Sequence, residues 1–264
     1  MRGVVDSHVA RRRFGQNFLV DAHYIARIVD AIDPQAGDNL VEIGPGLAAL
    51  TTGLTRRAGH ITAIEIDRDL AARLRAQFDP SALTLIEADA LAFDYATLAP
   101  SLRVVGNLPY NISSPLLFHL AGYESRLRDL HVMLQKEVVA RMTAAPASAD
   151  YGRLSVMLQA TFAITRLFIV PPGAFAPAPK VDSAVARLVP LGERKPFVAD
   201  QALFARVVAA AFAQRRKTLR NALSALCDAG TMREAGIDPA ARGETLPVGD
   251  FARLANLLAS RAGS

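Results

Sequence analysis

The sequence has no tryptophan, a single cysteine and no long apolar run. One thiol cannot form an internal disulfide or a cysteine-based zinc site, so Cys227 is expected to be a small apolar residue in a helix, and no metal site is expected. No stretch approaches the roughly 18 uninterrupted apolar residues of a membrane span. The N-terminus carries arginines but lacks the apolar core of a secretory signal. The sequence therefore predicts a soluble, cytoplasmic protein with no membrane partner.

Positive charge is present in excess, and its distribution is uneven. The 264 residues carry a net charge of +5, and the whole excess lies between residues 194 and 264. Two basic clusters stand out, "RRRFGQNF" with Arg11, Arg12 and Arg13, and "QRRKTLR" with Arg215, Arg216, Lys217 and Arg220. Such clusters are typical of surfaces that neutralise nucleic-acid phosphates, but a solvated helix face produces the same pattern. Charge alone leaves both interpretations open.

Short β-rich runs alternate with helical ones from residue 39 onward. The predicted strands cover residues 39–43, 60–66, 83–89, 102–107, 130–135, 166–170 and 183–190. Helical patterns over residues 47–58 and 68–78 separate the first of them. This alternation predicts an α/β domain with a parallel sheet covered by helices and with right-handed crossovers.

The pattern changes near residue 190. "LGERKPFVAD", residues 191–200, loses periodicity and contains glycine, proline and charge, so we interpret it as a linker. Only helical patterns follow, including "QALFARVVAAAFAQ", "RRKTLRNALSAL" and "VGDFARLANLLAS". We therefore expect an α/β domain over residues 1–190 with an N-terminal basic arm, and a small helical domain over residues 201–264.

A glycine-containing loop, "VEIGPGLAAL", places Gly44 and Gly46 between the first predicted strand and a helix, where a ligand can approach the backbone. Glu65 ends the next strand about 20 residues on, at the position where a carboxylate accepts hydrogen bonds from ribose hydroxyls. Asp89 follows the third strand and can accept a hydrogen bond from an adenine amino group. Three consecutive strand ends with suitable groups predict a nucleoside-binding site.

Glu42 bears on which nucleoside cofactor is bound. It lies two residues before Gly44, where a carboxylate repels a diphosphate and favours the cationic methionine end of S-adenosyl-L-methionine. The alternative is that Glu42 is a solvated or backbone-bonded strand residue. No Gly-Lys-Ser/Thr follows the loop, so the Walker pattern of phosphate binding is absent.

The fourth strand ends in "NLPY", which is predicted to lie at the same sheet edge. Pro109 cannot continue a ladder, Tyr110 offers a flat face, and Asn107 offers an amide oxygen. The Asn107 oxygen and the Leu108 carbonyl can accept both hydrogens of a base's exocyclic amine and direct its lone pair at a methyl group. The alternative is that these residues form only a turn.

Several motifs together resemble a known family. They are "RRRFGQNFLVD", "NLPYNISSPLL", "MLQKEVVARM", "YGRLSVMLQ", "VPPGAFAPAPKVDSAVARL" and "RRKTLRNAL". In this order they resemble the ribosomal RNA adenine dimethyltransferase family, most closely its small-subunit, KsgA-type members. The resemblance runs from about residue 11 to about residue 258.

The resemblance implies a Rossmann-like class I S-adenosyl-L-methionine-dependent methyltransferase domain with a small all-helical C-terminal domain. It implies dimethylation of two adjacent adenosines near the 3′ end of small-subunit ribosomal RNA during ribosome biogenesis. The implied cofactor-binding residues are Asn17, Leu19, Gly44, Glu65, Asp89 and Asn107, to which the residue pattern adds Glu42 and Gly46, and the implied catalytic residues are Asn107, Leu108, Pro109, Tyr110 and Phe175. Phe175 is implied to stack on the target base opposite Tyr110. Without the resemblance, Phe175 would be interpreted as a loop anchor packed on the core.

One residue departs from the family pattern. The loop usually reads Gly-Pro-Gly-x-Gly, and Ala48 replaces its third glycine. Because alanine is sterically mild in the first turn of a helix, we expect a cofactor site that is altered rather than lost.

The implied partner is the small ribosomal subunit and its RNA. Arg11, Arg12, Arg13, Arg215, Arg216, Lys217 and Arg220 are candidates for phosphate contacts, although some of them are expected to cap helices or pair internally. No extended apolar stripe indicates a dimer, so a monomer is expected. The alternatives are an Erm-type methyltransferase of large-subunit RNA, a ribosome-assembly factor in which methylation is secondary, and, more distantly, a nicotinamide oxidoreductase.

Overall fold

The structure is a computed structural model that describes residues 4–5, 8–9 and 17–262 of the chain. The chain divides into two compact units. The first comprises Met1–Val139 and Ile164–Pro190, and the second comprises Ala140–Ala163 and Leu191–Ser264. Among the described residues, no helix has the length and apolar character needed to cross a membrane.

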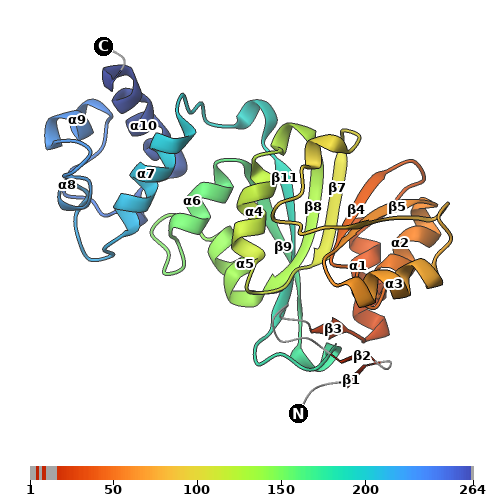
Figure 1. The fold of residues 1–264 in the computed structure, drawn as a ribbon. Helices are drawn as coiled ribbons and strands as arrows, with labels where there is room; N and C mark the ends of the chain where they lie inside the picture. The colour runs from red at the N-terminus through yellow and green to blue at the C-terminus, as the bar shows by residue number, and fades with distance from the viewer. Residues whose placement is uncertain (1–3, 6–7, 10–16, 263–264) are drawn as a thin grey trace. The chain divides into compact units, whose positions relative to one another are not determined.

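The first unit is built on a seven-stranded sheet with the strand order β6-β5-β4-β7-β8-β11-β9 (Figure 1). The five strands from β6 to β8 pair in parallel, and β11 runs antiparallel to β8. The strands are β4 (Asn39–Ile43), β5 (Ile61–Glu65), β6 (Leu83–Glu87), β7 (Leu102–Asn107), β8 (Leu127–Gln135), β9 (Phe162–Val170) and β11 (Ser183–Pro190). This arrangement confirms the predicted α/β fold class with a central parallel sheet.

The order of the parallel strands reverses beside β4. From β4 the chain proceeds outward to β5 and β6, then returns to the other side of β4 to form β7. Neighbouring crossovers therefore leave β4 in opposite directions. In open α/β sheets this switch point creates a crevice at the carboxyl ends of the strands. The glycine loop and the "NLPY" turn both begin at this edge.

Helices α2 and α3 pack beside the sheet and support that edge, α2 against β5 and α3 against β5 and β6. Helix α3 starts at its cap Asp67, whose side chain accepts from the Asp69 N–H, and it buries Leu70 and Leu74. The helices of this part are α1 (Ala22–Ile32), α2 (Thr51–Ala58), α3 (Arg68–Gln77), α4 (Ser113–Ala121) and α5 (Lys136–Thr143). Shorter elements are β1 (Val4–Val5), β2 (His8–Val9), β3 (Phe18–Leu19), β10 (Phe175–Ala176), η2 (Tyr95–Thr97), η3 (Glu124–Arg126) and η4 (Pro172–Ala174).

Arg103 holds the beginning of β7 in place through buried hydrogen bonds and ion pairs. Its guanidinium is buried and forms ion pairs with Asp38 and Asp129, at 2.6 and 3.0 Å. It also donates to the main-chain oxygen of Ile32, at the end of α1. Because each donor group of the planar guanidinium meets an acceptor, the charge can be buried at this point. The bonds tie β7, β8 and α1 together at the end of the sheet opposite the crevice.

The second unit is helical. Its helices are α6 (Arg153–Gln159), α7 (Gln201–Phe212), α8 (Leu219–Ala222), α9 (Ala229–Glu234) and α10 (Val248–Ala262), with turns η5 (Gly192–Arg194) and η6 (Gly243–Thr245). Helix α7 packs against α6 and α10. Phe204, Val208 and Phe251 are fully buried between these helices, so the unit has its own apolar core.

The unit boundaries differ from the predicted domain boundaries in the segment 140–163. The sequence assigned it to the first domain, yet Tyr151 and Val156 lie in the core of the second unit, and the Tyr151 hydroxyl donates to the Leu246 oxygen at 2.8 Å. The segment 191–200 contains the turn η5 and is held in place, because Asn256 of α10 bonds the Phe197 oxygen and the Ala199 N–H. A local sequence pattern does not show such long-range packing.

Candidate functional site

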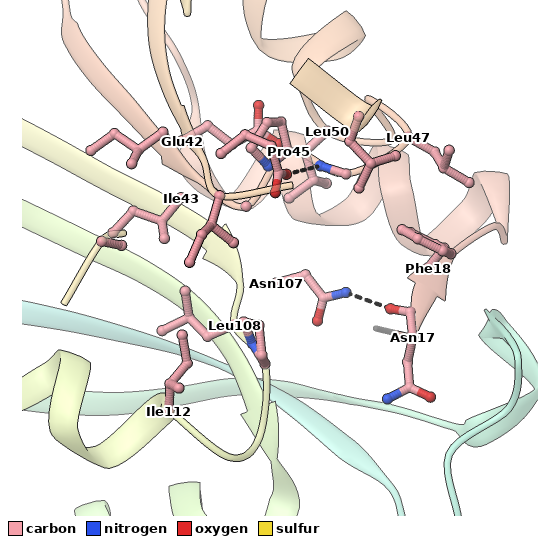
Figure 2. A pocket seen from close by; sticks show the side chains of 18 of the residues that line it. Asn17, Phe18, Glu42, Ile43, Pro45, Leu47, Leu50, Asn107, Leu108 and Ile112 are labelled. Carbon is pink, nitrogen blue, oxygen red and sulfur yellow. Dashed lines mark hydrogen bonds between the residues drawn. The ribbon is translucent and has the colours of Figure 1, made fainter. Parts of the chain in front are cut away.

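A pocket opens at the carboxyl ends of β4, β5, β6 and β7 (Figure 2). Its walls include every residue predicted to bind the cofactor and the whole "NLPY" sequence: Asn17, Leu19, Glu42, Gly44, Gly46, Glu65, Asp89, Asn107, Leu108, Pro109 and Tyr110. These residues come from five segments between residues 17 and 110. The structure therefore brings the predicted site residues together at the switch point, as their positions at successive strand ends predicted.

The strand register explains why these side chains meet. Glu42 pairs in parallel with Ala63 on β5 and with Val105 on β7. Glu65 and Asn107 each lie two residues beyond those partners, so they share with Glu42 one face of the sheet. Asp89 lies two residues beyond Glu87, the partner of Glu65, and has the same parity. An alternation of two residues thus places four polar side chains on one side of the crevice.

The glycine loop after β4 adopts a backbone that favours glycine. Gly44 and Gly46 have φ angles of +66° and +58°. A Cβ atom at Gly46 would lie 3.2 Å from the Phe18 ring, so the loop and β3 approach closely. The Gly46 N–H donates to the Glu65 Oε2 atom at 3.2 Å. This bond ties the loop to the end of β5.

The position of Ala48 differs from the expectation that it lies in the first turn of a helix. The helix after the loop begins at Thr51, so Ala48 lies in the preceding turn rather than in a first helical turn. Its φ is +67°, in the left-handed region that is unfavourable for residues with a Cβ atom. The substitution of glycine by alanine is therefore strained, and the argument from helical mildness was wrong.

The pocket is acidic. Its described lining contains the three carboxylates of Glu42, Glu65 and Asp89 and no lysine, arginine or histidine. Glu65 accepts from the N–H groups of Gly46 and Asp67, and burial raises its pKa. Asp89 is exposed, and its Oδ1 atom accepts from the Leu91 N–H at 2.9 Å. Cationic ligands are favoured here over anionic ones.

Glu42 is the most deeply placed of these carboxylates. Only 2% of it is exposed, and its Oε2 atom has no hydrogen-bond partner. Burial raises its pKa to about 7, and the nearby charge of Glu65 acts in the same direction. The solvated-residue interpretation of Glu42 does not hold, because the side chain is enclosed.

Hydrogen bonds hold the "NLPY" turn at both ends. The Asn107 Nδ2 atom donates to the Asn17 oxygen at 3.0 Å, and Figure 2 shows the amide oxygen turned away from that contact. The Leu108 N–H donates to the Met133 oxygen on β8 at 3.1 Å. The Tyr110 hydroxyl lies 2.7 Å from the Ser183 Oγ atom on β11. The turn is therefore a rigid, preorganised wall of the pocket rather than a simple reversal of the chain.

Phe175 does not line the pocket. It pairs with Leu19 between β10 and β3, is 4% exposed and belongs to the apolar core with Val170 and Val185. It is not among the residues that line the pocket. This position matches the alternative of a loop anchor, and the role of Phe175 in base stacking stays a prediction.

The basic candidates divide into three groups. Arg11, Arg12 and Arg13 lie outside the described residues. Arg215 pairs with Glu244 at 3.2 Å and donates to the Ala149 oxygen, as expected for some of these arginines. Arg216, Lys217 and Arg220 are exposed in the turn between α7 and α8 and on α8 itself. The predicted helix over residues 215–226 is thus largely a turn, with α8 limited to Leu219–Ala222.

Sequence reasoning missed two features of the site. Ile66 directly follows Glu65, is 47% exposed and lines the pocket. Ser183, which bonds Tyr110, is fully buried although it belongs to a motif that the resemblance had highlighted. Ile66 lies at the end of the predicted strand beside Glu65, where only the carboxylate was considered, whereas Ser183 acquires its role from β11, which is distant in the sequence from Tyr110.

The fold and the pocket define a class I S-adenosyl-L-methionine-dependent methyltransferase. The chain matches the family described as ribosomal RNA adenine dimethylase over residues 7–260. The protein named ribosomal RNA small subunit methyltransferase A from Aromatoleum aromaticum is 57% identical, covering 98% of this chain and 97% of the relative. A protein of the same name from Thiobacillus denitrificans is 58% identical, covering 96% and 100%.

Solved structures agree with this assignment. A dimethyladenosine transferase from Plasmodium falciparum shares the fold, with a TM-score of 0.75 and 23% identity over 90% of this chain and 95% of the other. The 23S rRNA methyltransferase ErmE has a TM-score of 0.68 and 27% identity, covering 92% and 100%. The chain belongs to the ribosomal RNA adenine dimethylase family.

Proposed function

We propose that this protein dimethylates the exocyclic amino groups of two adjacent adenosines near the 3′ end of small-subunit ribosomal RNA, with S-adenosyl-L-methionine as methyl donor. The observation that carries the proposal is the assembly of all predicted cofactor residues and the "NLPY" turn in one pocket. The relatives at 57 and 58% identity carry the small-subunit name, whereas the large-subunit enzyme ErmE is 27% identical. This difference favours the small-subunit substrate over the Erm-type alternative.

The pocket fits the cofactor chemically. The exposed Asp89 carboxylate suits the adenine amine, and Glu65 suits the ribose hydroxyls, because ionised carboxylates accept hydrogen bonds only. Gly44, Gly46, Asn17 and Leu19 close the pocket around the methionine part. The buried carboxylate of Glu42, whose Oε2 atom has no hydrogen-bond partner, matches the positive charge of that part. When bound, the cofactor supplies the electrophilic methyl group.

Asn107 and its neighbours orient the target amine. The Asn107 Nδ2 atom is engaged by Asn17, which leaves the amide oxygen as an acceptor at the β7 edge. The side chain of Leu108 is buried, so its contribution comes from the main-chain carbonyl. Tyr110 provides an aromatic face held by Ser183, and Phe175 is proposed to stack on the other side of the base. These residues catalyse by positioning and by stabilising the developing charge on the amine.

Binding of the RNA is assigned to the basic residues. Arg216, Lys217 and Arg220 are exposed, and Arg11, Arg12 and Arg13 are proposed to act with them. Phosphate neutralisation supplies sequence-independent affinity, while stacking of the flipped base contributes about 1 to 3 kcal/mol per aromatic contact. We propose the small ribosomal subunit in the cytoplasm as partner and a monomer as the functional form.

The test is transfer of labelled methyl groups from S-adenosyl-L-methionine to unmethylated small and large ribosomal subunits, with mapping of the modified adenines. Two dimethyladenosines in the small subunit alone are expected. Label in large-subunit RNA would instead establish the Erm-type activity. Binding to subunits without any label would identify an assembly factor and contradict the proposal.

A further inference from the structure

The pocket contains an excess of negative charge that no other side chain of its described lining offsets. Three carboxylates line it, and its described lining contains no lysine, arginine or histidine. The methyl donor carries a sulfonium, an ammonium and a carboxylate, for a net charge of +1, whereas the demethylated product S-adenosylhomocysteine has lost the sulfonium charge. A pocket of this composition therefore interacts differently with donor and product.

Glu42 differs from the other two carboxylates. Glu65 accepts two main-chain N–H groups, and Asp89 is exposed to solvent. Glu42 is enclosed, and its Oε2 atom has no hydrogen-bond partner. The fully buried Thr51 hydroxyl, at the first residue of α2, makes no hydrogen bond of normal geometry; its interaction with Glu42 lowers the Glu42 pKa, but burial has the larger and opposite effect. A carboxylate whose burial is so weakly compensated favours its neutral form, and a cation that enters the pocket reverses that preference.

Glu42 lies on the strand next to Asn107, so a change in its protonation occurs near the residue that is proposed to orient the target amine. The strand order puts Asp89, Glu65, Glu42 and Asn107 in succession across the sheet edge. Glu42 pairs with Val105, so it lies two residues deeper than Asn107 on the adjacent strand. The groups that act on it are the Glu65 carboxylate and the Thr51 hydroxyl, and the Asp89 carboxylate and the Tyr110 phenol line the same pocket. None of these groups carries positive charge.

We propose that Glu42 distinguishes the methyl donor from the demethylated product, being ionised while the donor is bound and taking up a proton from solvent once the product remains. The inference rests on the proposed function. The adenine amine forms the new bond to carbon with its lone pair, the sulfur keeps the electron pair of the broken bond, and the amine then releases one proton to solvent. Once the sulfonium charge is gone, Glu42 returns to the titration of the ligand-free protein and takes up about half a proton from solvent at pH 7, so its charge favours the donor and gives no such advantage to the product.

The experiment is isothermal titration calorimetry of the whole protein with S-adenosyl-L-methionine and with S-adenosylhomocysteine. Each titration is run at pH 6, 7 and 8, in two buffers of different ionisation enthalpy, so that protons exchanged on binding are counted. At pH 7 the donor is expected to release about half a proton and the product close to none, because Glu42 has a pKa of about 7 in the free protein. Donor affinity is expected to rise about tenfold from pH 6 to pH 8, whereas product affinity stays nearly constant.

The matched variants are Glu42→Gln and Asp89→Asn. Glu42→Gln should abolish the proton release by the protein and reduce the preference for donor over product. Any proton exchange that remains in this variant comes from ionisable groups of the ligand itself. Retained binding of S-adenosylhomocysteine by this variant shows that the pocket is folded. Asp89→Asn removes a solvent-exposed carboxylate of the same pocket. Donor binding to this variant should still release about half a proton at pH 7, even if the affinity for the donor changes.

Each result decides between alternatives. Equal proton counts for donor and product in the wild-type protein would overturn the inference, even if Glu42→Gln fails to fold. Unchanged proton release in Glu42→Gln would overturn it as well. Failure of the wild-type protein to bind either compound would contradict the proposed function itself, whereas binding of both without proton exchange contradicts only the role of Glu42.

Discussion

The cofactor pocket of the first unit and the basic turn of the second use charge in opposite ways. In the pocket, the Glu42 and Glu65 carboxylates are buried, and those of Glu65 and Asp89 are fixed by main-chain N–H groups. In the turn, Arg216 and Lys217 are exposed, and only Arg215 among the basic residues of residues 214–217 has an ion-pair partner within the described chain. Buried fixed charges recognise one small ligand with high selectivity, whereas exposed mobile charges attract a polyanion over a long range and are screened by salt. The two regions therefore respond differently to mutation, pH and ionic strength.

The largest effect is expected for Asn107→Ala. This substitution removes a catalytic amide oxygen from the pocket and leaves the basic turn of the second unit unchanged. Methyl transfer should fall by about 10² to 10³, because the amide oxygen no longer orients the target amine. Single-turnover methylation of small subunits measures the loss, and calorimetry should show a much smaller change in cofactor affinity. Asn39→Ala is the matched control, since the Asn39 amide also bonds a main-chain oxygen, that of Pro100, at the other end of β4. Substantial turnover by the Asn107 variant would refute its assigned role.

A second prediction concerns the stability of the ligand-free protein. The folded pKa of Glu42, about 7, lies above its ordinary value of 4.5. The folded state therefore binds more protons than the unfolded state in this window, and stability falls as pH rises from about 4.5 to 7. Glu42→Gln should raise the free energy of unfolding at pH 8 by up to about 3 kcal/mol and change it little at pH 4.5. Urea denaturation at both pH values measures the difference, and equal effects at both would contradict the raised pKa.

Arg216→Ala combined with Lys217→Ala tests the basic turn. Loss of two phosphate contacts should weaken binding to small-subunit RNA about tenfold and reduce the slope of log K against log salt by about 1.5 to 2. Cofactor affinity should stay unchanged. Arg56→Ala combined with Arg57→Ala removes two exposed arginines of the first unit, and it controls for the change in total charge. If the double variant loses RNA and cofactor affinity equally, the separation between the two regions fails.

A smaller effect is expected where the pocket depends on Ser183. The Tyr110 hydroxyl and the Ser183 Oγ atom are 2.7 Å apart, so Ser183→Ala and Tyr110→Phe each remove one hydrogen bond. Each variant should lower kcat/KM about 3- to 10-fold, corresponding to about 1 kcal/mol. The double variant should lose no more than either single one, because both changes remove the same bond. Additive losses would show that Ser183 does not act through Tyr110. Ser155→Ala, in the second unit, serves as the buried-serine control.

Much of the pocket was predictable because its residues lie at strand ends. An alternation of period two and short parallel crossovers fix which side chains share an edge, so Glu42, Glu65 and Asn107 follow from the pattern alone. The partners of these residues were not predictable. Ser183 and Phe18 reach the site through β11 and β3, and the packing of residues 140–163 with α7 depends on contacts across about 50 residues. Long-range packing leaves no local signature in the sequence.

The smallest prediction comes from the one place where sequence reasoning misjudged the pocket. Ala48 was placed in a helix, whereas its φ of +67° belongs to a turn that the family usually forms with glycine. A left-handed alanine costs about 1 kcal/mol relative to glycine, so Ala48→Gly should stabilise the protein by roughly that amount less the entropy that glycine gains in the unfolded chain. Thermal unfolding should show a rise in Tm of a few degrees, with cofactor affinity equal or slightly higher. Ala49→Gly is the control, because Ala49 has no positive φ and should be destabilised by the same substitution. A lower Tm for Ala48→Gly would mean that the loop backbone differs from the one described here, and that the strain is not stored at this residue.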